Sequence, residues 1–197
     1  MKEKPVGSKE RLIEATIDLM SSQGFQPMGI QSILDKANVT KSNFYYHFKS
    51  KEELCLTALE YMSDYFFDKM VLPSLENKEH TPRERLKNFL TGMARGMKEN
   101  SCQRGCPFVN LATETSDFHP AFREQIEKFY RRYRKVLSDC YRDGVESGEF
   151  RSELTAEDAA YLILSSMNGA IVLAKVQKDP AAMERGIDSL VALISTN

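Results

Sequence analysis

The feature of this chain that most constrains its fold is a run of short helices, separated by tight turns, near the N-terminus. Apolar residues recur at the helical spacing i, i+3, i+4, i+7, and so share one face, at Ile30, Ile33, Leu34 and Ala37. Asn38 and Val39 then turn the chain, and Thr40 can cap a third helix that carries Phe44 and Phe48 inward. Two helices of about two turns, joined by a tight turn and braced by a longer helix, form a helix-turn-helix unit.

The outer surface of this third predicted helix combines short polar groups, phenols, an imidazole and lysines. The second short helix of such a unit lies in the DNA major groove. Ser42 and Asn43 can donate and accept at base edges, where Asn suits adenine. Other side chains can bind phosphates and so fix the position of the protein along the duplex: Tyr45, Tyr46, His47, Lys49 and Lys51. We therefore predict a sequence-specific interface with double-stranded DNA.

Helix signals continue through the rest of the chain, and no segment has a convincing strand pattern. Thr81-Pro82-Arg83-Glu84 combines an N-cap, a proline at the first helical position and a returning Glu. We predict an all-α fold of about nine helices. A three-helix helix-turn-helix DNA-binding domain is expected at residues 1–51, followed by a larger helical ligand-binding and dimerisation domain at residues 52–197.

Charge and composition agree with a DNA partner at the N-terminal end. The net charge of the chain is −1, but residues 1–51 carry eight Lys/Arg against five Asp/Glu. The longest uncharged run, from Ala159 to Ala174, has 16 residues, too short and too polar to span a bilayer. With no signal peptide visible and four cysteines that do not resemble a secreted disulfide framework, we expect a cytoplasmic protein without a membrane partner.

Catalytic and cofactor motifs are absent from the sequence. It has no Gly-rich phosphate loop, nucleophile elbow or metal-binding helix pair, so we predict no enzyme and no cofactor. Cys102 and Cys106 lack further ligands at zinc spacing. Glu114, Asp117 and His119 could bind a metal, but a solvated helix junction is the commoner explanation. A helical protein-interaction adaptor is the remaining alternative, and it leaves the polar and phenolic mixture on the third helix unexplained.

Together these segments resemble the N-terminal region of the tetracycline-repressor (TetR) family of transcriptional regulators. The resemblance covers roughly residues 8–60, through Ala37-Asn38-Val39-Thr40-Lys41-Ser42-Asn43-Phe44-Tyr45-Tyr46-His47-Phe48 and Ser50-Lys51-Glu52-Glu53-Leu54. It implies a homodimer on a palindromic operator, a repressor more often than an activator, and a small-molecule or stress signal read by the C-terminal domain. It also implies DNA contacts at Thr40, Lys41, Ser42, Asn43, Tyr45, Tyr46, His47 and Lys51.

The uncharged helix over 159–174 is the predicted dimer surface. A helix this apolar needs burial all round, and the small residues Ser165, Ser166, Gly169 and Ala170 would let a partner approach closely. With the final helix, it could form half of a four-helix bundle across a two-fold axis. The alternative is an internal core helix.

A ligand pocket is harder to place, because the same apolar residues suit either a pocket or an ordinary core. The candidate lining residues are Phe66, Phe67, Met70, Phe89, Met93, Met97, Phe108, Phe118, Phe129 and Tyr133.

Cys106 is the candidate for redox sensing. It precedes Pro107 at a predicted helix start, with Arg104 nearby, and both features favour a thiolate. The run from Gly105 to Glu114 is similar to the TetR subgroup that includes the repressor of N-ethylmaleimide reductase, although Pro107 departs from its pattern. That resemblance implies a sensor of electrophiles and reactive chlorine, with Lys175 as its partner. A buried structural cysteine is the alternative.

Overall fold

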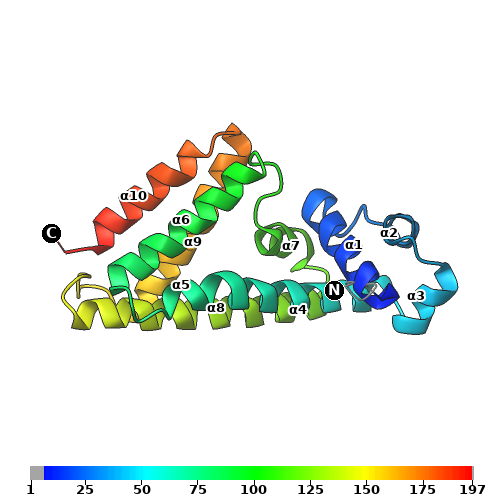
Figure 1. Cartoon of the computed structure of the whole chain (residues 1–197), viewed down its shortest axis with the longest axis horizontal. Helices are drawn as coiled ribbons and strands as arrows, with labels where there is room; N and C mark the ends of the chain where they lie inside the picture. The colour runs from blue at the N-terminus through cyan, green and yellow to red at the C-terminus, as the bar shows by residue number, and fades with distance from the viewer. Residues whose placement is uncertain (1–6, 197) are drawn as a thin grey trace, which may run out of the picture. The chain divides into compact units, whose positions relative to one another are not determined.

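The protein is built from helices throughout the part of the chain that the computed structural model describes, residues 7–196 (Figure 1). The elements are α1 (Ser8–Gln23), α2 (Ile30–Ala37), α3 (Lys41–His47), α4 (Lys51–Phe66), the π-helical segment η1 (Phe67–Val71), α5 (Leu72–Leu75), α6 (Pro82–Glu99), α7 (Pro107–Thr115), α8 (Pro120–Glu146), α9 (Ala156–Gln177) and α10 (Ala181–Ile194). Because α4, η1 and α5 follow one another without a break, the described residues contain nine separate helical rods. The predicted all-α fold is confirmed.

The chain divides into two compact units. The first contains residues 7–64 and 107–126, and the second contains residues 65–106 and 127–196. Helices α4 and α8 each run from one unit into the other. The predicted domain boundary after residue 51 falls at the start of α4, inside the first unit.

In the first unit, α1 packs against α2, α3 and α7. Helix α2 ends at Ala37, and the φ of 51° at the next residue, Asn38, lies in the left-handed region that Asn tolerates. Thr40 then caps α3 as predicted, because its side-chain oxygen accepts a hydrogen bond from the Asn43 N–H. Phe44 and Phe48 are buried, 0% and 3% exposed, so α3 is fixed to the unit by its inner side.

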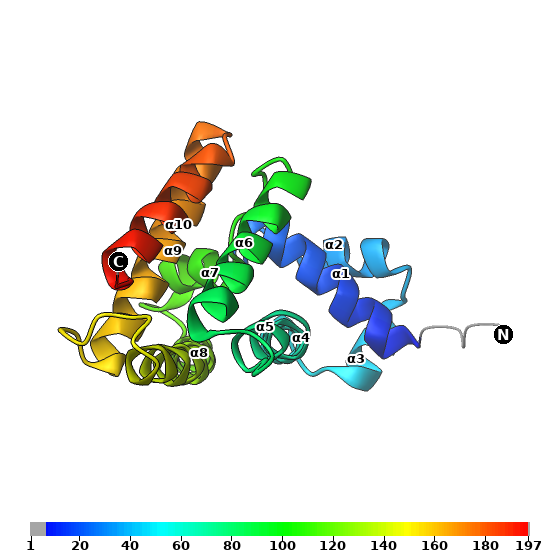
Figure 2. The same ribbon diagram turned by 60° about the vertical axis from the view of Figure 1, so that its left-hand side comes forward.

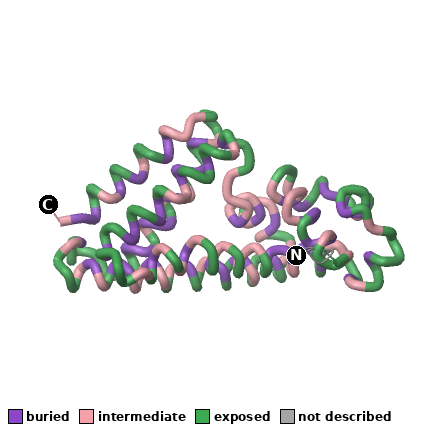
Figure 3. Tube along the Cα trace, in the orientation of Figure 1, coloured by how far each residue is buried: buried purple, intermediate pink, exposed green. Residues whose placement is uncertain are grey.

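In the second unit, α9 and α10 lie side by side and α6 packs against both (Figure 2). The predicted capping box of α6 is present, since Thr81 and Glu84 each accept a hydrogen bond from the other's N–H. Figure 3 shows buried and exposed residues alternating along α10. Its buried face contains Met183, Ile187, Leu190 and Ile194.

An ion pair between the buried Arg85 and the part-exposed Asp143 links α6 to α8 within this unit. The Arg85 guanidinium is 3% exposed, donating to the Leu75 carbonyl at 2.9 Å and to the Asp143 carboxylate at 2.7 Å. Lys78 also donates to Asp143. The hydrogen bond from Lys78, followed by that from Arg85, lowers the pKa of Asp143 against the opposing effect of its burial.

We expect Asp143→Ala to lower the free energy of unfolding by about 3 kcal/mol, because Arg85 is left as a buried charge without its carboxylate. Urea denaturation measures this loss. Since the pKa of Asp143 is lowered in the folded protein, the stabilisation is present at neutral pH and is lost as pH falls through the folded-state pKa.

The matched control is Asp139→Ala on the same helix, where the carboxylate is 45% exposed and pairs with Lys135 and Arg142. Its cost should stay below about 1 kcal/mol. Equal losses for the two variants would contradict the role of the buried pair.

Candidate nucleic-acid interface

The outer side of α3 presents the residues predicted to contact DNA. Tyr46 is 84% exposed and Tyr45 is 49% exposed, so both phenols face outward. Lys41, Ser42 and Asn43, at the N-terminal end of the helix, are exposed as well. Because the opposite side is held by buried Phe44 and Phe48, the backbone that carries these groups has a fixed position.

Two hydrogen bonds orient side chains at the ends of α3. The hydroxyl oxygens of Thr40 and Ser42 lie 3.1 Å apart, next to the bond that caps the helix. At the other end, the Ser8 hydroxyl lies 2.9 Å from Nε2 of His47, and the His47 ring meets the Tyr46 ring edge-on. The imidazole is therefore tied to the first residue of α1. Ser8 was not singled out in the sequence, because no local pattern links residues 8 and 47.

Lys51 differs from the other predicted contacts, because its ammonium group is engaged within the protein. It donates to the carbonyls of Phe25 at 3.0 Å and Met28 at 2.9 Å. It also lies 4.0 Å from the centroid of the Phe25 ring. Lys51 thus braces the loop between α1 and α2 (residues 24–29, the α1–α2 loop), and its role toward DNA stays a prediction.

The acidic cluster considered as a metal site has other partners. Glu114 accepts hydrogen bonds from the main-chain N–H groups of Phe25 and Gln26. The His119 ring contacts the rings of Phe25 and Phe122. Within residues 7–196, no group of three or more His, Cys, Asp and Glu side chains is arranged to hold a metal ion.

Two models of known protein families match this chain. A model described as bacterial regulatory proteins of the tetR family matches residues 12–58. A second, described as the tetracyclin repressor-like C-terminal domain, matches residues 82–190, more than half of the chain. The chain belongs to the TetR family of transcriptional regulators. Its curated relatives are regulators and not enzymes, in agreement with the sequence-based prediction.

Individual relatives of this TetR-family protein are distant but extend along most of its length. It is 26% identical over 185 residues to an uncharacterized HTH-type transcriptional regulator in the lacX 3' region of Lactococcus lactis, covering 93% of this chain and 91% of that protein. It is 26% identical over 178 residues to the transcriptional repressor DhaR of a Mycobacterium species, covering 90% and 87%. Among solved structures, the reduced form of Escherichia coli NemR is similar, with a TM-score of 0.89 and 24% identity over 96% of this chain and 98% of that chain. This structural likeness shows the fold.

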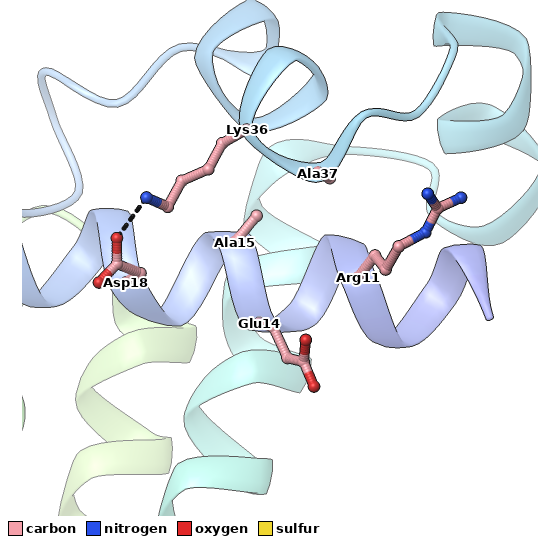
Figure 4. Close-up of a pocket in the computed structure, with 6 residues that line it drawn as sticks. All are labelled: Arg11, Glu14, Ala15, Asp18, Lys36 and Ala37. Atoms are coloured by element: carbon pink, nitrogen blue, oxygen red, sulfur yellow. Dashed lines mark ion pairs between the residues drawn. The ribbon is translucent and has the colours of Figure 1, made fainter. Parts of the chain in front are cut away.

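A hollow of about 290 Å³ lies between α1 and α2 of the N-terminal helix-turn-helix region, α1 to α3, which we call the head (Figure 4). Its lining carries charges of both signs, from Arg11, Glu14, Asp18 and Lys36, together with Ala15 and Ala37. Lys36 reaches across it to form an ion pair with Asp18 (Figure 4). This hollow lacks the apolar lining typical of small-molecule sites. We interpret the ion pair as a brace between α2 and α1.

Most of the predicted pocket residues belong to the second unit, where several form an aromatic cluster. Phe66, Phe67, Phe89, Phe129 and Tyr133 have ring centroids 5.5 to 6.3 Å apart, mostly in edge contact. Such mutual contact is typical of a packed core. The methionines of the predicted set, Met70, Met93 and Met97, lie in the same unit, whereas Phe108 and Phe118 belong to the first. Their assignment to a ligand pocket stays a prediction.

Cys106 directly precedes α7 and, of the four cysteines, is the one that is not buried. Burial raises the pKa of the Cys55 thiol to about 12 and that of Cys140 to about 11. Burial first, and then a Coulombic interaction with Cys106, raise the pKa of Tyr130 and of Tyr133 above that of a free phenol.

Two lysines of the C-terminal region bond to the segment that contains this cysteine. Lys175 Nζ donates to the carbonyl of Arg104 at 3.4 Å, and Lys178 Nζ donates to that of Cys102 at 3.4 Å. Lys175 is thus bonded two residues before Cys106 in the chain. The pairing of Cys106 with Lys175 as a sensor stays a prediction.

Proposed function

We propose that this protein is a cytoplasmic repressor that binds a palindromic operator as a homodimer and releases it when an electrophile or oxidant modifies Cys106. The observation that carries the DNA-binding part is the outer side of α3, where exposed polar, phenolic and basic groups stand on a buried aromatic support. Few other partners need this mixture on one short helix.

In this proposal the groups on α3 divide between bases and phosphates. Ser42 and Asn43 reach base edges, because they lie near the N-terminal end of a helix that enters the major groove. Lys41, Tyr45 and Tyr46 bind phosphates. Of the remaining predicted contacts, Thr40 and His47 help to fix the two ends of α3, and Lys51 helps to fix the α1–α2 loop.

The dimer surface is assigned to α9 and α10. A stripe of exposed residues runs along one side of α9, and we call it the α9 stripe: Tyr161, Ser165, Gly169, Val172, Leu173 and Val176. Leu193 of α10 is also exposed, at 58%. Apolar side chains in such a row, beside a glycine that leaves room for close approach, suit a second copy of the same surface.

Judged by length and composition alone, helix α9 is long and apolar enough to cross a membrane. It is longer than the uncharged run noted in the sequence, because it begins at Ala156 and continues past Lys175 to Gln177. Of the 18 consecutive residues that are most apolar, 44% are buried inside the protein. A core helix that is completed by a partner subunit can be equally long and apolar, and we assign α9 to that class.

Binding to a palindromic duplex is expected to depend steeply on salt, because contacts with phosphates release counterions. Affinity should fall by about a thousandfold between about 50 and about 200 mM salt, measured by fluorescence anisotropy. Lys41→Ala should make the slope of log K against log salt less steep by about one unit. Lys87→Ala, which removes an exposed lysine of α6, should leave the slope unchanged.

The same assay separates the contributions of the exposed aromatic groups. Tyr45→Ala should weaken binding about tenfold without lowering the melting temperature, since its side chain is exposed. His47→Ala should also weaken binding about tenfold, and it should lower the melting temperature slightly because it removes the part-buried hydrogen bond to Ser8. An affinity that is flat with salt, together with full binding by both variants, would contradict the interface. Such a result would favour a helical adaptor that binds only proteins.

A further inference from the structure

The α1–α2 loop receives a carboxylate from a helix far away in the sequence. The N–H of Phe25 donates to Glu114 Oε2 at 2.9 Å, and the N–H of Gln26 donates to Glu114 Oε1 at 2.6 Å. Each carboxylate oxygen therefore accepts one main-chain hydrogen bond. Bonds between a charged acceptor and N–H groups are shorter and stronger than neutral ones.

Gly24 makes this approach possible. Its φ is +85°, in the left-handed region, and its N–H closes α1 by donating to the Met20 carbonyl. A Cβ at this position would lie 2.5 Å from Glu114 Oε2. A side chain here would therefore be strained by the backbone and would also push the carboxylate away.

The carbonyl groups of the same loop are held by a cation. Lys51, at the start of α4, donates to the carbonyls of Phe25 and Met28. The loop is thus fixed through its N–H groups by Glu114 and through its C=O groups by Lys51. Because α2 begins at Ile30, directly after the loop, these bonds set where α2 starts and hence where the block of α2 and α3 lies on α1.

Glu114 stands in the last turn of α7, and α7 begins at Pro107, next to Cys106 in the chain. Helix α7 also packs against α1. A single short helix therefore leads from the proposed sensing residue to the carboxylate that holds the DNA-binding head.

We propose that Glu114 is a positioning residue for operator binding, and that loss of its bonds to the α1–α2 loop is the step by which a change in α7 lowers operator affinity. The inference rests on the proposed function. It adds a contact within the chain through which α7 acts on the orientation of α3.

The surroundings of these bonds separate positioning from simple stabilisation. Gln26 is exposed, and the Phe25 N–H is part-buried, so water can reach the two N–H groups once the carboxylate is removed. The head should then stay folded while the α1–α2 loop becomes free to shift. A residue with a purely structural role would instead change the melting temperature and leave the response to the inducer unaltered.

The experiment compares Glu114→Gln with Asp117→Asn, which makes the same charge change at a neighbouring exposed position. The probe is a palindromic duplex selected from a randomised library with the wild-type protein. Glu114→Gln keeps the size of the side chain but places an amide NH2 against one of the two N–H donors. We expect it to weaken binding about tenfold with little change in melting temperature, and Asp117→Asn to bind as the wild type does.

The second readout is the factor by which N-ethylmaleimide weakens binding. If the bonds to Glu114 transmit the signal, this factor should be several times smaller in Glu114→Gln than in the wild type, because the variant has already lost them. Equal affinity of Glu114→Gln and Asp117→Asn, or an equal factor in Glu114→Gln and the wild type, would overturn the inference. Failure of the wild type to select any duplex, or to be released by N-ethylmaleimide at all, would instead remove the proposed function.

Discussion

A negative charge on the α9 stripe, introduced as Val176→Asp, is expected to separate the subunits and to abolish tight operator binding. Val176 is 75% exposed in the monomer and Leu173, beside it, is 53% exposed. In the proposed dimer both become buried against the same stripe of the partner, so one substitution places two carboxylates in an apolar interface. A buried charge without a partner costs several kcal/mol on each side.

The loss of DNA binding follows from the geometry of a palindrome. One α3 helix reads only a few base pairs, and the dimer gains its specificity by placing two such helices on half-sites related by a two-fold axis. A monomer keeps one half-site, so affinity should fall by about a thousandfold, toward the level of non-specific binding. Light scattering after size exclusion reports the mass, and anisotropy with the selected duplex reports the affinity.

Phe118→Asp is the matched control, since Phe118 is 74% exposed and lies outside α9 and α10. It should leave both the mass and the affinity unchanged. A Val176→Asp protein that remains dimeric, or a monomeric variant that binds the palindrome as tightly as the wild type, would show that another surface joins the subunits.

Local signals were sufficient to predict the helices of the head. The apolar spacing in α2, the turn at Asn38 and the cap at Thr40 each act within a few residues, so the sequence reveals them directly. The inward direction of Phe44 and Phe48 followed from helical periodicity alone. The other residues of α3 must then face outward, and these residues form the candidate interface.

The bonds that hold the head together could not be predicted in the same way. Glu114 bonds to residues 25 and 26, and Lys51 bonds to residues 25 and 28, across separations that carry no periodic pattern. A lysine beside a DNA-contacting helix is equally consistent with a phosphate contact and with an internal hydrogen bond. Only the folded structure distinguishes these two roles, because the turn of the α1–α2 loop is what brings the accepting carbonyls within reach of Lys51.

The apolar residues of the second unit pose a different problem. Phe66 and Phe129 are side chains of the kind that line apolar pockets, yet their rings contact each other and the neighbouring ring of Tyr133. Sequence composition cannot separate a lined cavity from a filled one, since both use the same side chains. Cys106 was easier to single out, because its place before a helix is a local property.

Cys106→Ser is expected to leave operator binding intact and to abolish its release by N-ethylmaleimide or hypochlorite. In the wild type, alkylation should weaken binding by about 100-fold, within the range of couplings between distinct sites. Cys55, Cys102 and Cys140 are buried, and burial raises the pKa of Cys55 and Cys140, so these thiols should react slowly. Mass spectrometry of the native protein should find one adduct per chain.

The physical reason lies in the surroundings of the sulfur. Cys106 is part-buried where it precedes α7, so a maleimide ring added there meets side chains that are already packed. The control is Cys102→Ser, which removes a fully buried thiol from the same segment and should release DNA as the wild type does. Release that persists in Cys106→Ser would make this thiol structural. The C-terminal unit would then respond to a conventional ligand, and α7 would have to receive its signal from elsewhere in the fold.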